Sequence, residues 1–470
     1  MTSHEAADTL AAISTPLGEA GIGIVRLSGP LAWAIAGRLF RPHRPRPTCQ
    51  SHRLYLGHII DPQGDIIDEV MVTFMRAPYT YTREDVVEIN CHSGYGVLRR
   101  ILDLALAAGA RLARPGEFTL RAFLSGRLDL TQAEAILEVI RARTETHLQV
   151  AAAHLHGGLG RRLAEMRQGL LDLLARVEAA LDFPEEAGEL DPAMVREGLA
   201  RHQGSLQALA DSYEAGRLLR EGLLVVIAGR PNVGKSSLLN RLLDRERAIV
   251  TDIPGTTRDL VEESITLKGV MVRFSDTAGL RPAQDRIEAL GIERTRERLQ
   301  QADLVLYLVD ASLPLAPADG AALAELAGQP GLVVINKIDL PGSLSEAELP
   351  GITAWPLTRI SAKTGQGIEN LQEKIVALGL GGGLKVAGEV ITQARHHEHL
   401  RQCLAYLDQA RGLLGPYKNY ENCENCAPEP PWELVALELG AAIHELGEIT
   451  GEEVGEAILD RIFGQFCLGK

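Results

Sequence analysis

The segment from Gly229 to Ser236 is the feature that most constrains this chain. It reads Gly-Arg-Pro-Asn-Val-Gly-Lys-Ser and fits the phosphate-binding loop G-x-x-x-x-G-K-[ST]. A continuous apolar run, 223–228, precedes it, as in a strand buried on both faces, and a helical stretch follows. The glycines let backbone N–H groups close on phosphate oxygens at the positive end of a helix. The segment therefore predicts a parallel α/β domain that binds a nucleotide, and a plain Gly-rich turn is the alternative.

The loop and a second motif supply the phosphate and metal contacts. In the loop we expect contacts from Asn232, Val233, Gly234, Lys235, Ser236 and Ser237. Lys235 would neutralise the outer phosphates, and the Ser236 hydroxyl would hold Mg²⁺. The second motif follows an expected strand over 270–275 and consists of Asp276, Thr277, Ala278 and Gly279. Its Asp suits the Mg²⁺ shell, and the N–H of its Gly suits the γ-phosphate.

Two further motifs select the base. Asn336-Lys337-Ile338-Asp339 follows an expected strand over 332–335. The Asp339 carboxylate can accept two hydrogen bonds from the N1–H and 2-amino group of guanine, a pair that adenine lacks. Near Ser361, Ala362 and Lys363 a backbone N–H would meet the guanine O6. These motifs predict binding of GTP rather than ATP.

A switch segment lies between the phosphate loop and the second motif. We expect nucleotide contacts from Thr251, Asp252, Ile253, Pro254, Gly255, Thr256 and Thr257. Thr257 would complete the Mg²⁺ shell. Leu280 occupies the position directly after the Asp-x-x-Gly, where Ras-like GTPases carry the Gln that orients the attacking water. The chain therefore needs another water-orienting group, and Arg281 is no clear arginine finger.

Patterning divides the chain into an α+β segment, an inserted nucleotide-binding domain and two helical segments. Its 470 residues, 46% of them apolar, suggest about three domains. We expect an α+β domain over 1–125, helices over 126–219, the Ras-like P-loop GTPase domain over 220–378, and helices again over 379–470. Apolar residues recur at helical spacing over 130–183, and we expect a single break in this helical stretch, at Gly157. The flanking helical segments would form one domain with the GTPase domain inserted into it.

Charge and cysteine content exclude some classes of protein. The net charge of −14 argues against a general nucleic-acid coat, although 20–60 carries six arginines and no acid. Six cysteines in this length do not resemble a disulfide scaffold. No basic segment opens the chain and no window of 18 residues is purely apolar, so we expect neither a signal peptide nor a membrane span. A cytoplasmic location is the expectation.

The motifs together resemble the bacterial tRNA-modification GTPase family MnmE, also called TrmE. Beyond the GTPase motifs, the likeness rests on Gly-Ile-Gly-Ile-Val-Arg-Leu-Ser-Gly at 21–29, Tyr-Thr-Arg-Glu-Asp-Val-Val-Glu at 81–88, the run 114–130 and the Cys-x-Gly-Lys ending at 467–470. Other GTPases that lack the catalytic Gln share the GTPase motifs but not these segments. The resemblance covers essentially the whole chain.

The resemblance implies a function, cofactors and partners. The family adds an aminomethyl-type group, aminomethyl or carboxymethylaminomethyl, to C5 of the wobble uridine of certain tRNAs. An FAD-binding partner protein would join a homodimer, formed through the N-terminal domains, in a heterotetramer. The one-carbon unit would come from 5-formyl- or 5,10-methylene-tetrahydrofolate. The alternative is a ribosome- or complex-assembly GTPase in which the N-terminal domain is only a dimerisation module.

By the same resemblance, specific residues bind the folate and the potassium ion that activates the family's GTPase. The folate site would use Arg26, Glu88, Arg127 and Lys470, with Arg127 standing where the family often has Lys. Because Lys470 is far away in sequence, we consider a second subunit as one way to complete the site. K⁺ would be held by Asn232, Thr251, Ile253 and Thr256, and Glu288 would orient the catalytic water through a second water.

The cysteines leave two questions open. Cys467 is either a packed thiol or, by the resemblance, a reactive catalytic cysteine. Cys423-Glu-Asn-Cys426 could bind zinc together with Cys403 and a neighbouring histidine, but no second Cys pair stands at ribbon spacing. We favour ordinary loop thiols for that pair.

Overall fold

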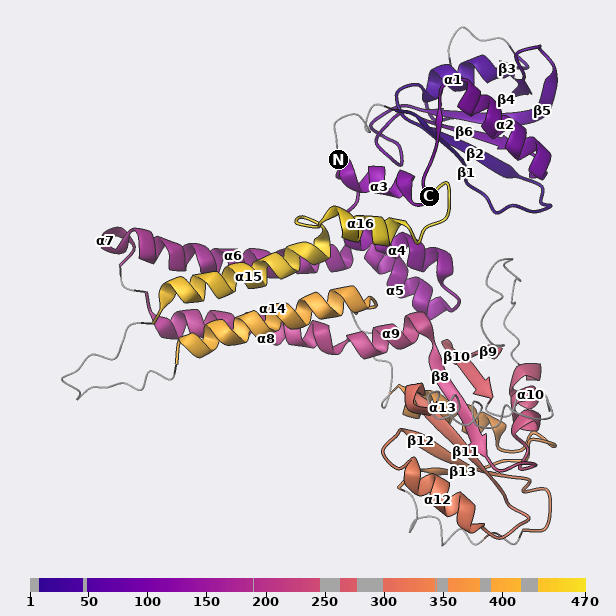
Figure 1. Cartoon of the computed structure of the whole chain (residues 1–470), viewed down its shortest axis with the longest axis vertical. Coiled ribbons are helices and arrows are strands. Elements are labelled where there is room, and N and C mark those ends of the chain that lie inside the picture. The colour runs from indigo at the N-terminus through magenta and orange to yellow at the C-terminus, as the bar shows by residue number, and fades with distance from the viewer. Residues whose placement is uncertain are drawn as a thin grey trace, which may run out of the picture. The chain divides into compact units, whose positions relative to one another are not determined.

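The chain is described by a computed structural model over residues 8–44, 49–188, 190–245, 263–276, 299–342, 344, 354–380, 390–415 and 430–470. It forms two compact units, the first made of 1–140, 153–202 and 402–470 and the second of 141–152 and 203–401. Each unit contains its own β-sheet (Figure 1). The mixture of an α+β N-terminal part, long helices and a second α/β sheet confirms the predicted fold class.

The sheet of the first unit has seven strands in the order β3-β4-β5-β6-β2-β1-β7. The strands are β1 (Leu10–Ile13), β2 (Gly23–Ser28), β3 (Phe40–Pro42), β4 (Arg53–Ile60), β5 (Ile66–Met75), β6 (Val86–Cys91) and β7 (Arg111–Leu112). Neighbours are antiparallel except β1 and β7. Helices α1 (Ala32–Leu39) and α2 (Tyr95–Ala107) bury one face in a shared aliphatic core.

The opposite face of this sheet carries the polar residues and several exposed apolar ones. Side chains alternate between the faces of a strand, so Val25 and Leu27 of β2 enter the core while Arg26 points to the other side. On that second face Leu54 and Leu56 of β4 are 60% and 51% exposed. We call it the open face. It is the face on which the candidate site of the N-terminal part is built.

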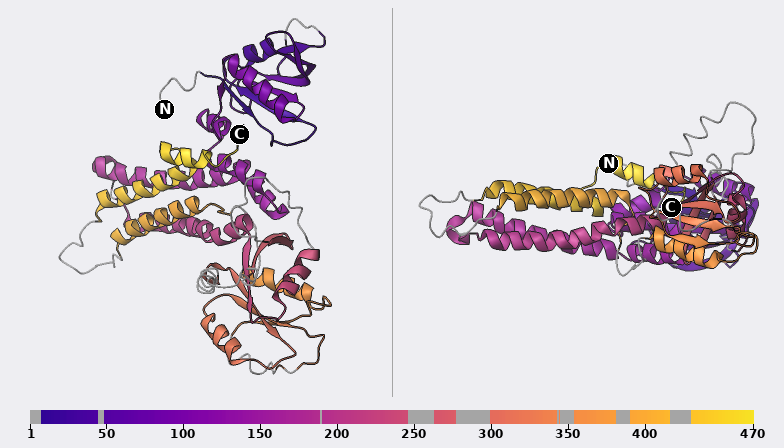
Figure 2. Two further views of the ribbon diagram at one scale, coloured as in Figure 1. Left: turned by 45° about the vertical axis from the view of Figure 1, so that its right-hand side comes forward. Right: turned by 90° about the horizontal axis from the view of Figure 1, so that it is seen from below.

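Helices of very different lengths follow the first sheet. They are α3 (Glu117–Leu124), α4 (Leu130–Arg141), α5 (Glu145–Leu155), α6 (Gly158–Asp182), α7 (Pro184–Ala187), α8 (Pro192–Asp211), α14 (Ala394–Leu413), α15 (Trp432–Thr450) and α16 (Glu456–Phe463). α6 and α15 lie side by side in Figures 1 and 2. Each buries a stripe at helical spacing, Leu159, Leu163 and Leu170 on α6 and Leu439, Ile443 and Leu446 on α15. Segments far apart in sequence thus share one helical core.

The expected single break in the helical stretch 130–183 is wrong in detail. The chain also leaves the helix between α4 and α5, where the Thr144 hydroxyl accepts a hydrogen bond from the His147 N–H at 3.2 Å and caps the new helix. Gly157 adopts φ +78° and precedes α6, so the break ends there and Gly158 to Gly160 already form the first turn of α6. Apolar spacing alone predicted a continuous helix at this point. Thr144 instead caps the start of a separate helix, α5.

The second unit is an open, mostly parallel sheet in the order β13-β12-β11-β8-β10-β9. Its strands are β8 (Leu223–Gly229), β9 (Glu263–Leu267), β10 (Val270–Asp276), β11 (Leu304–Asp310), β12 (Gly331–Asn336) and β13 (Leu357–Arg359), and only β9 is antiparallel to its neighbour. α10 (Lys235–Arg245) and α13 (Ile368–Gly379) share one core with the sheet, and α12 (Pro317–Glu325) belongs to a second. α9 (Tyr213–Glu221) leads into β8. The strands expected from the buried apolar runs are confirmed.

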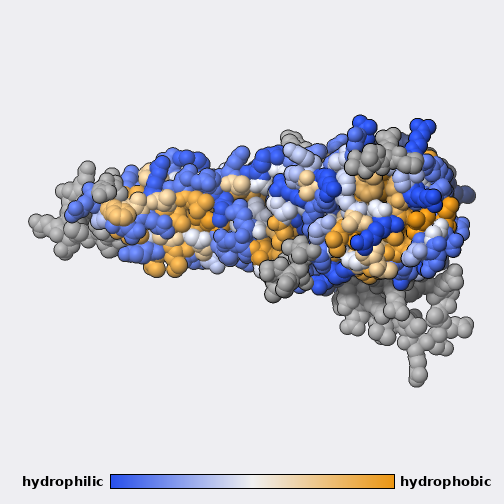
Figure 3. Space-filling view, turned by 90° about the horizontal axis from the view of Figure 1, so that it is seen from above, coloured by the Kyte–Doolittle hydropathy of each residue, from blue (hydrophilic) through white to orange (hydrophobic). Residues whose placement is uncertain are grey.

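Hydrophilic and apolar side chains are interspersed over the face of the molecule that Figure 3 draws. Within the described ranges, no helix is both long and apolar enough to cross a membrane.

Candidate functional site

The phosphate loop connects the carboxyl end of β8 to the first turn of α10. Gly234 has φ +102°, and a Cβ at this position would lie 2.3 Å from the Asn336 side-chain nitrogen, so the loop requires glycine here. The buried Lys235 donates to the carbonyl oxygens of Gly229 at 2.7 Å and Arg230 at 2.8 Å. The ammonium group is therefore held at the mouth of the loop, where phosphate oxygens would meet it.

Asn336 joins the phosphate loop to the loop that follows β13. Its side-chain nitrogen donates to the Val233 carbonyl at 2.8 Å, and its side-chain oxygen accepts the Ala362 N–H at 3.0 Å. Asn336 is only 2% exposed. The carboxyl ends of parallel strands meet at one edge of a sheet, which is where open α/β sheets bind ligands. One buried amide thus fixes two ligand-binding loops relative to each other.

Lys337 and Asp339 lie beside this amide. Lys337 Nζ donates to the Asn232 carbonyl at 2.8 Å and to Asp310 Oδ2 at 2.6 Å. The Ser361 hydroxyl donates to Asp339 Oδ1 at 2.6 Å, and this bond holds the pKa of Asp339 below its ordinary value. Asp339 is therefore an ionised acceptor, as recognition of two N–H donors on a purine edge requires. The Ala362 N–H already bonds Asn336, so the base carbonyl would share this donor or use the next one, Lys363.

A second polar site lies on the open face of the first unit. Arg26 of β2 and Glu88 of β6 are directly opposite in the strand register, and Arg26 Nε donates to Glu88 Oε1 at 2.8 Å. The Arg26 guanidinium also lies 5.9 Å from the Tyr81 ring centroid and 5.7 Å from that of Phe118. Strand pairing therefore brings the charged pair together, and residues outside these strands add two aromatic rings beside it.

The C-terminal segment completes this site within the same chain. The Gly469 carbonyl accepts a hydrogen bond from Arg26 Nη1 at 3.0 Å, and the Lys470 carbonyl accepts one from the Phe118 N–H at 3.2 Å. Burial, together with the charge of Arg26, lowers the pKa of the Lys470 ammonium, although Glu88 acts in the opposite direction. The Arg26 contact is made by this chain's own terminus, so Lys470 needs no second subunit to reach the site.

A cavity of about 570 Å³ opens beside these groups. Its lining includes Tyr81, Arg127 and Lys470, and the Arg127 guanidinium lies 4.9 Å from the centroid of the Tyr81 ring. An aromatic ring, two cationic side chains and the neighbouring Glu88 suit a planar donor–acceptor ring with an anionic tail. Of the four residues expected to bind folate, Arg26, Arg127 and Lys470 thus lie near the Tyr81 side chain, and Glu88 is joined to them through Arg26.

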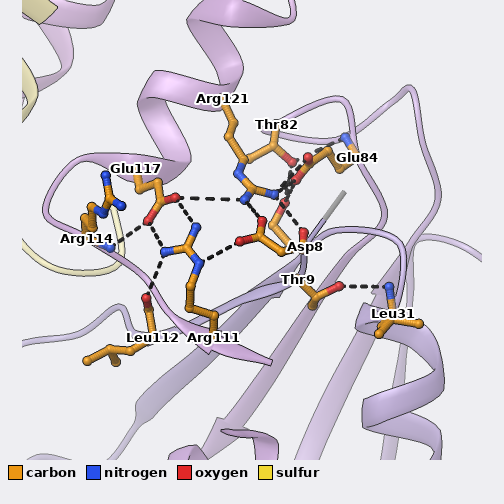
Figure 4. A network of polar contacts seen from close by, with 11 residues as sticks. Asp8, Thr9, Leu31, Thr82, Glu84, Arg111, Leu112, Arg114, Glu117 and Arg121 are labelled. Carbon is orange, nitrogen blue, oxygen red and sulfur yellow. Dashed lines mark hydrogen bonds and ion pairs between the residues drawn. The ribbon is translucent and has the colours of Figure 1, made fainter. Parts of the chain in front are cut away.

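An ion-pair network anchors α3, which carries Phe118 (Figure 4). Arg121, whose side chain is 9% exposed, pairs with Asp8, Glu84 and Glu117, and Arg111 pairs with Asp8 and Glu117. Partial burial acts to raise the pKa of Asp8, but hydrogen bonds from the two arginines outweigh it and lower that pKa. The network therefore ties the N-terminal segment to the helix that supports the second site.

The comparisons with known proteins agree with this architecture. The family model described as "GTP-binding protein TrmE N-terminus" matches residues 9–127, and "MnmE helical domain" matches 130–467. A tRNA modification GTPase MnmE from Chloroflexus aurantiacus is 47% identical over 98% of this chain and 100% of its own length. Those from Moorella thermoacetica and Heliobacterium modesticaldum are 46% and 47% identical, each over 98% of this chain and 99% of their own length.

The chain belongs to the MnmE family of tRNA modification GTPases. As a member it is an enzyme that hydrolyses GTP, and the nucleotide motifs predicted from the sequence belong to that activity. The resemblance inferred from the motifs is therefore confirmed. The domain boundaries and the individual site residues stay predictions.

Several predicted MnmE site residues lie outside the part of the chain that the structure describes. They are Thr251, Asp252, Ile253, Pro254, Gly255, Thr256, Thr257, Thr277, Ala278, Gly279 and Glu288, and Leu280, Arg281, Cys423 and Cys426 lie outside it as well. Asp276 ends β10, paired with Ile227 of β8, at the same sheet edge as the phosphate loop. Cys467 is exposed, next to the C-terminal residues that contact Arg26. Ser236 and Ser237 fall in the first turn of α10.

Sequence reasoning missed the contacts that position the predicted residues. Asp310, which holds Lys337, ends a strand whose apolar run gave no sign of an ion pair. Tyr81 and Phe118 stood inside matched segments, but their role depends on a packing that periodicity does not show. An acid directly after a buried parallel strand was the only signal available for Asp310.

Proposed function

We propose that this MnmE-family GTPase modifies C5 of the wobble uridine in certain tRNAs, adding an aminomethyl or carboxymethylaminomethyl group. The one-carbon unit would come from 5-formyl- or 5,10-methylene-tetrahydrofolate, and an FAD-binding partner protein would act with the chain. The observation that carries the proposal is that Arg26, Arg127 and Lys470 lie near Tyr81, with Glu88 hydrogen-bonded to Arg26. These groups come from four distant segments, and none of them belongs to the nucleotide motifs.

The residues present fit a reduced folate. When bound, the folate supplies a one-carbon unit. Glu88 accepts N–H donors of the pterin, while Arg26 orients that carboxylate through its 2.8 Å hydrogen bond. The Tyr81 ring offers an apolar wall, and Arg127 and Lys470 attract the anionic glutamate tail. A lowered Lys470 pKa indicates that this ammonium lacks full compensation, which an anionic ligand would supply.

Calorimetry on the full chain tests the folate site. We use the full chain because Arg127 and Lys470 both lie outside the predicted 1–125 domain. Arg26→Ala and Glu88→Ala each remove one partner of a charge-assisted hydrogen bond, worth about 1.5–3 kcal/mol. We expect affinity for 5-formyl-tetrahydrofolate to fall about tenfold or more. Arg99→Ala is the control, because Arg99 pairs with Asp103 on α2. Unchanged affinity in both variants would reject the site.

The nucleotide half of the proposal follows from the GTPase motifs. The phosphates would lie against Asn232, Val233, Gly234 and Lys235, with Mg²⁺ held by Ser236 and Thr257. We propose that K⁺ binds at Asn232, Thr251, Ile253 and Thr256, where its charge does the work of an arginine finger. Glu288 would orient the attacking water through a second water, in place of the Gln that Leu280 replaces.

Single-turnover hydrolysis tests this half separately. Replacing K⁺ by Na⁺, or Glu288 by Ala, should slow turnover strongly while GDP affinity stays nearly unchanged. Asn232→Ala should remove most of the K⁺ stimulation. Equal rates in both salts, or a wild-type rate for Glu288→Ala, would refute the mechanism without touching the folate assignment.

The proposed assembly is a homodimer through the N-terminal domains, joined by the FAD-binding protein in a heterotetramer. The apolar residues of the open face, Leu54, Leu56 and the 43% exposed Met71, offer a surface that a second copy could cover. With tRNA as substrate, we place the activity in the cytoplasm. Mass spectrometry of tRNA nucleosides from a deletion strain decides the function. Unmodified wobble uridines are expected, and intact modification with altered ribosome profiles would favour an assembly GTPase instead.

A further inference from the structure

Three side chains of types that can ligate a metal ion converge on the open face. None of them belongs to the two sites described above. His43 follows β3, His58 belongs to β4 and Glu69 belongs to β5. His43 Nε2 lies 3.4 Å from His58 Nε2 and 3.2 Å from Glu69 Oε1, and His58 Nε2 lies 4.0 Å from the same oxygen. The side chains of His58, His43 and Glu69 are 29%, 38% and 54% exposed. All three ligand atoms therefore point at one small volume that solvent can reach.

The backbone sets this convergence. His58 and Glu69 are direct partners in the β4–β5 register, and the His43 N–H donates to the Leu56 carbonyl at 3.1 Å, which continues the β3–β4 pairing. Opposite partners on one sheet face have their Cβ atoms about 4.5–5.5 Å apart. The three side chains thus come from two adjacent strands and the residue that follows a third, and they meet in the arrangement that the structure already has.

We propose that His43, His58 and Glu69 bind one divalent transition-metal ion of the zinc class. Zinc takes imidazole nitrogen and carboxylate oxygen at about 2.0–2.2 Å, so neighbouring ligand atoms of a tetrahedral site lie about 3.3–3.5 Å apart. Two of the three separations, 3.4 and 3.2 Å, lie within about 0.1 Å of this range, and the third, 4.0 Å, is wider by about half an ångström. The fourth position is open to water or to a second copy of the chain.

The ion would pin the edge of the sheet. β3 is a three-residue edge strand, and β4 is its one neighbouring strand in the part of the sheet that the structure describes. Arg41 lies opposite His58 in the register, and its charge opposes an additional cation. We therefore expect weaker binding than in a closed four-ligand site, and stabilisation of β3 as the main effect. The test must distinguish a metal site from a cluster in which His43, His58 and Glu69 contact one another without a metal ion.

The test uses full-length protein stripped of metal with EDTA. All samples carry Cys423→Ser and Cys426→Ser, so that the loop thiols contribute nothing. Cobalt(II) is titrated and followed by its visible ligand-field absorption, then displaced by zinc. We expect one ion per chain at this site, and a loss of affinity of about tenfold or more in each of His43→Ala, His58→Ala and Glu69→Gln.

The matched control is His92→Ala. His92 Nδ1 lies 2.8 Å from Asp68 Oδ1 in the same domain, and His92 is not one of the three proposed metal ligands. It should bind cobalt as the parent does. Zinc should raise the melting temperature of the parent and the control but not of Glu69→Gln, which keeps the side-chain shape. Equal cobalt affinity in the parent, His58→Ala and Glu69→Gln would overturn the proposal, as would absorption lost equally in His92→Ala.

Discussion

The nucleotide site and the proposed folate site are built in opposite ways. The nucleotide site consists of short contiguous motifs, each placed by the strand that precedes it, and one buried amide, Asn336, holds two of its loops together. The proposed folate site takes single residues from distant segments and includes the C-terminal stretch whose Gly469 carbonyl contacts Arg26. A motif-built site survives changes elsewhere in the chain, whereas an assembled site depends on every element that carries a part of it.

This difference predicts how damage spreads. A substitution in the nucleotide site should change nucleotide binding and leave folate affinity alone. A substitution in the supports of the folate site, such as the network around Arg121, should lower folate affinity without any contact to folate. The four predictions below test this separation.

Asp339→Asn should have the largest effect. An amide presents a donor where the guanine edge needs an acceptor, and sites built on such hydrogen bonds reject a mismatched partner strongly. We expect GDP affinity to fall about a hundredfold or more and preference to move toward xanthosine diphosphate, which carries a carbonyl where guanine carries its amino group. A competition titration measures both. Folate affinity should match the parent, and Asp408→Asn, on an exposed pair with Arg411, is the control.

Arg121→Ala should separate the sites from the other side. The change leaves Asp8, Glu84 and Glu117 without this cation, and breaking a buried ion pair typically costs about 3–5 kcal/mol. We expect the melting transition of the first unit to move down and folate affinity to fall with it. GDP affinity should stay at the parent value. A loss of GDP binding equal to that of folate would contradict the proposed independence.

Asp310→Asn should weaken the nucleotide site without changing its choice of base. Asp310 holds Lys337 at 2.6 Å, and its own pKa is lowered because hydrogen bonds from Lys337 and Ser312 outweigh the effect of burial. Loss of a charged hydrogen bond of about 1.5 kcal/mol corresponds to roughly tenfold in affinity. The same competition titration should show weaker GDP binding with guanine still preferred. A switch in base preference would mean that Asp310 does more than position Lys337.

Sequence reasoning reached the two sites unequally for the same physical reason. Buried apolar runs predicted the strands β8, β11 and β12. The residues that follow these strands were then predicted to bind the ligand, because open α/β sheets bind ligands at the carboxyl ends of their strands. Arg26 and Glu88 meet only through the β2–β6 register, and Gly469 meets Arg26 across most of the chain. Local periodicity predicts neither of these two contacts, so only the family resemblance indicated these residues. The same holds for His43, His58 and Glu69, which no motif marked.

The smallest predicted effect concerns α15, the helix that precedes α16 and the C-terminal residues of the folate site. His444 Nδ1 bonds the Glu453 carboxylate, and His444 Nε2 lies 3.9 Å from Glu448. The hydrogen bond to Glu453, helped by the charges of both acids, raises the pKa of His444 above its ordinary value. The imidazolium is therefore stabilised in the folded state. Its contribution is complete below the unfolded pKa of about 6.5 and is lost as pH rises through the higher folded pKa.

Because the His444 side chain is 52% exposed, solvent screens the pair and the contribution should be about 0.2–1 kcal/mol. We expect His444→Gln to lower the melting temperature slightly at pH 6 and to match the parent at pH 8.5. His156→Gln, at an exposed position, should match the parent at both values. Folate affinity of His444→Gln should follow the same pH pattern, since the C-terminal residues continue from this helix, while GDP affinity stays constant. If His444→Gln and the parent bind folate equally at pH 6, the proposed folate site tolerates small changes in the helices that support it.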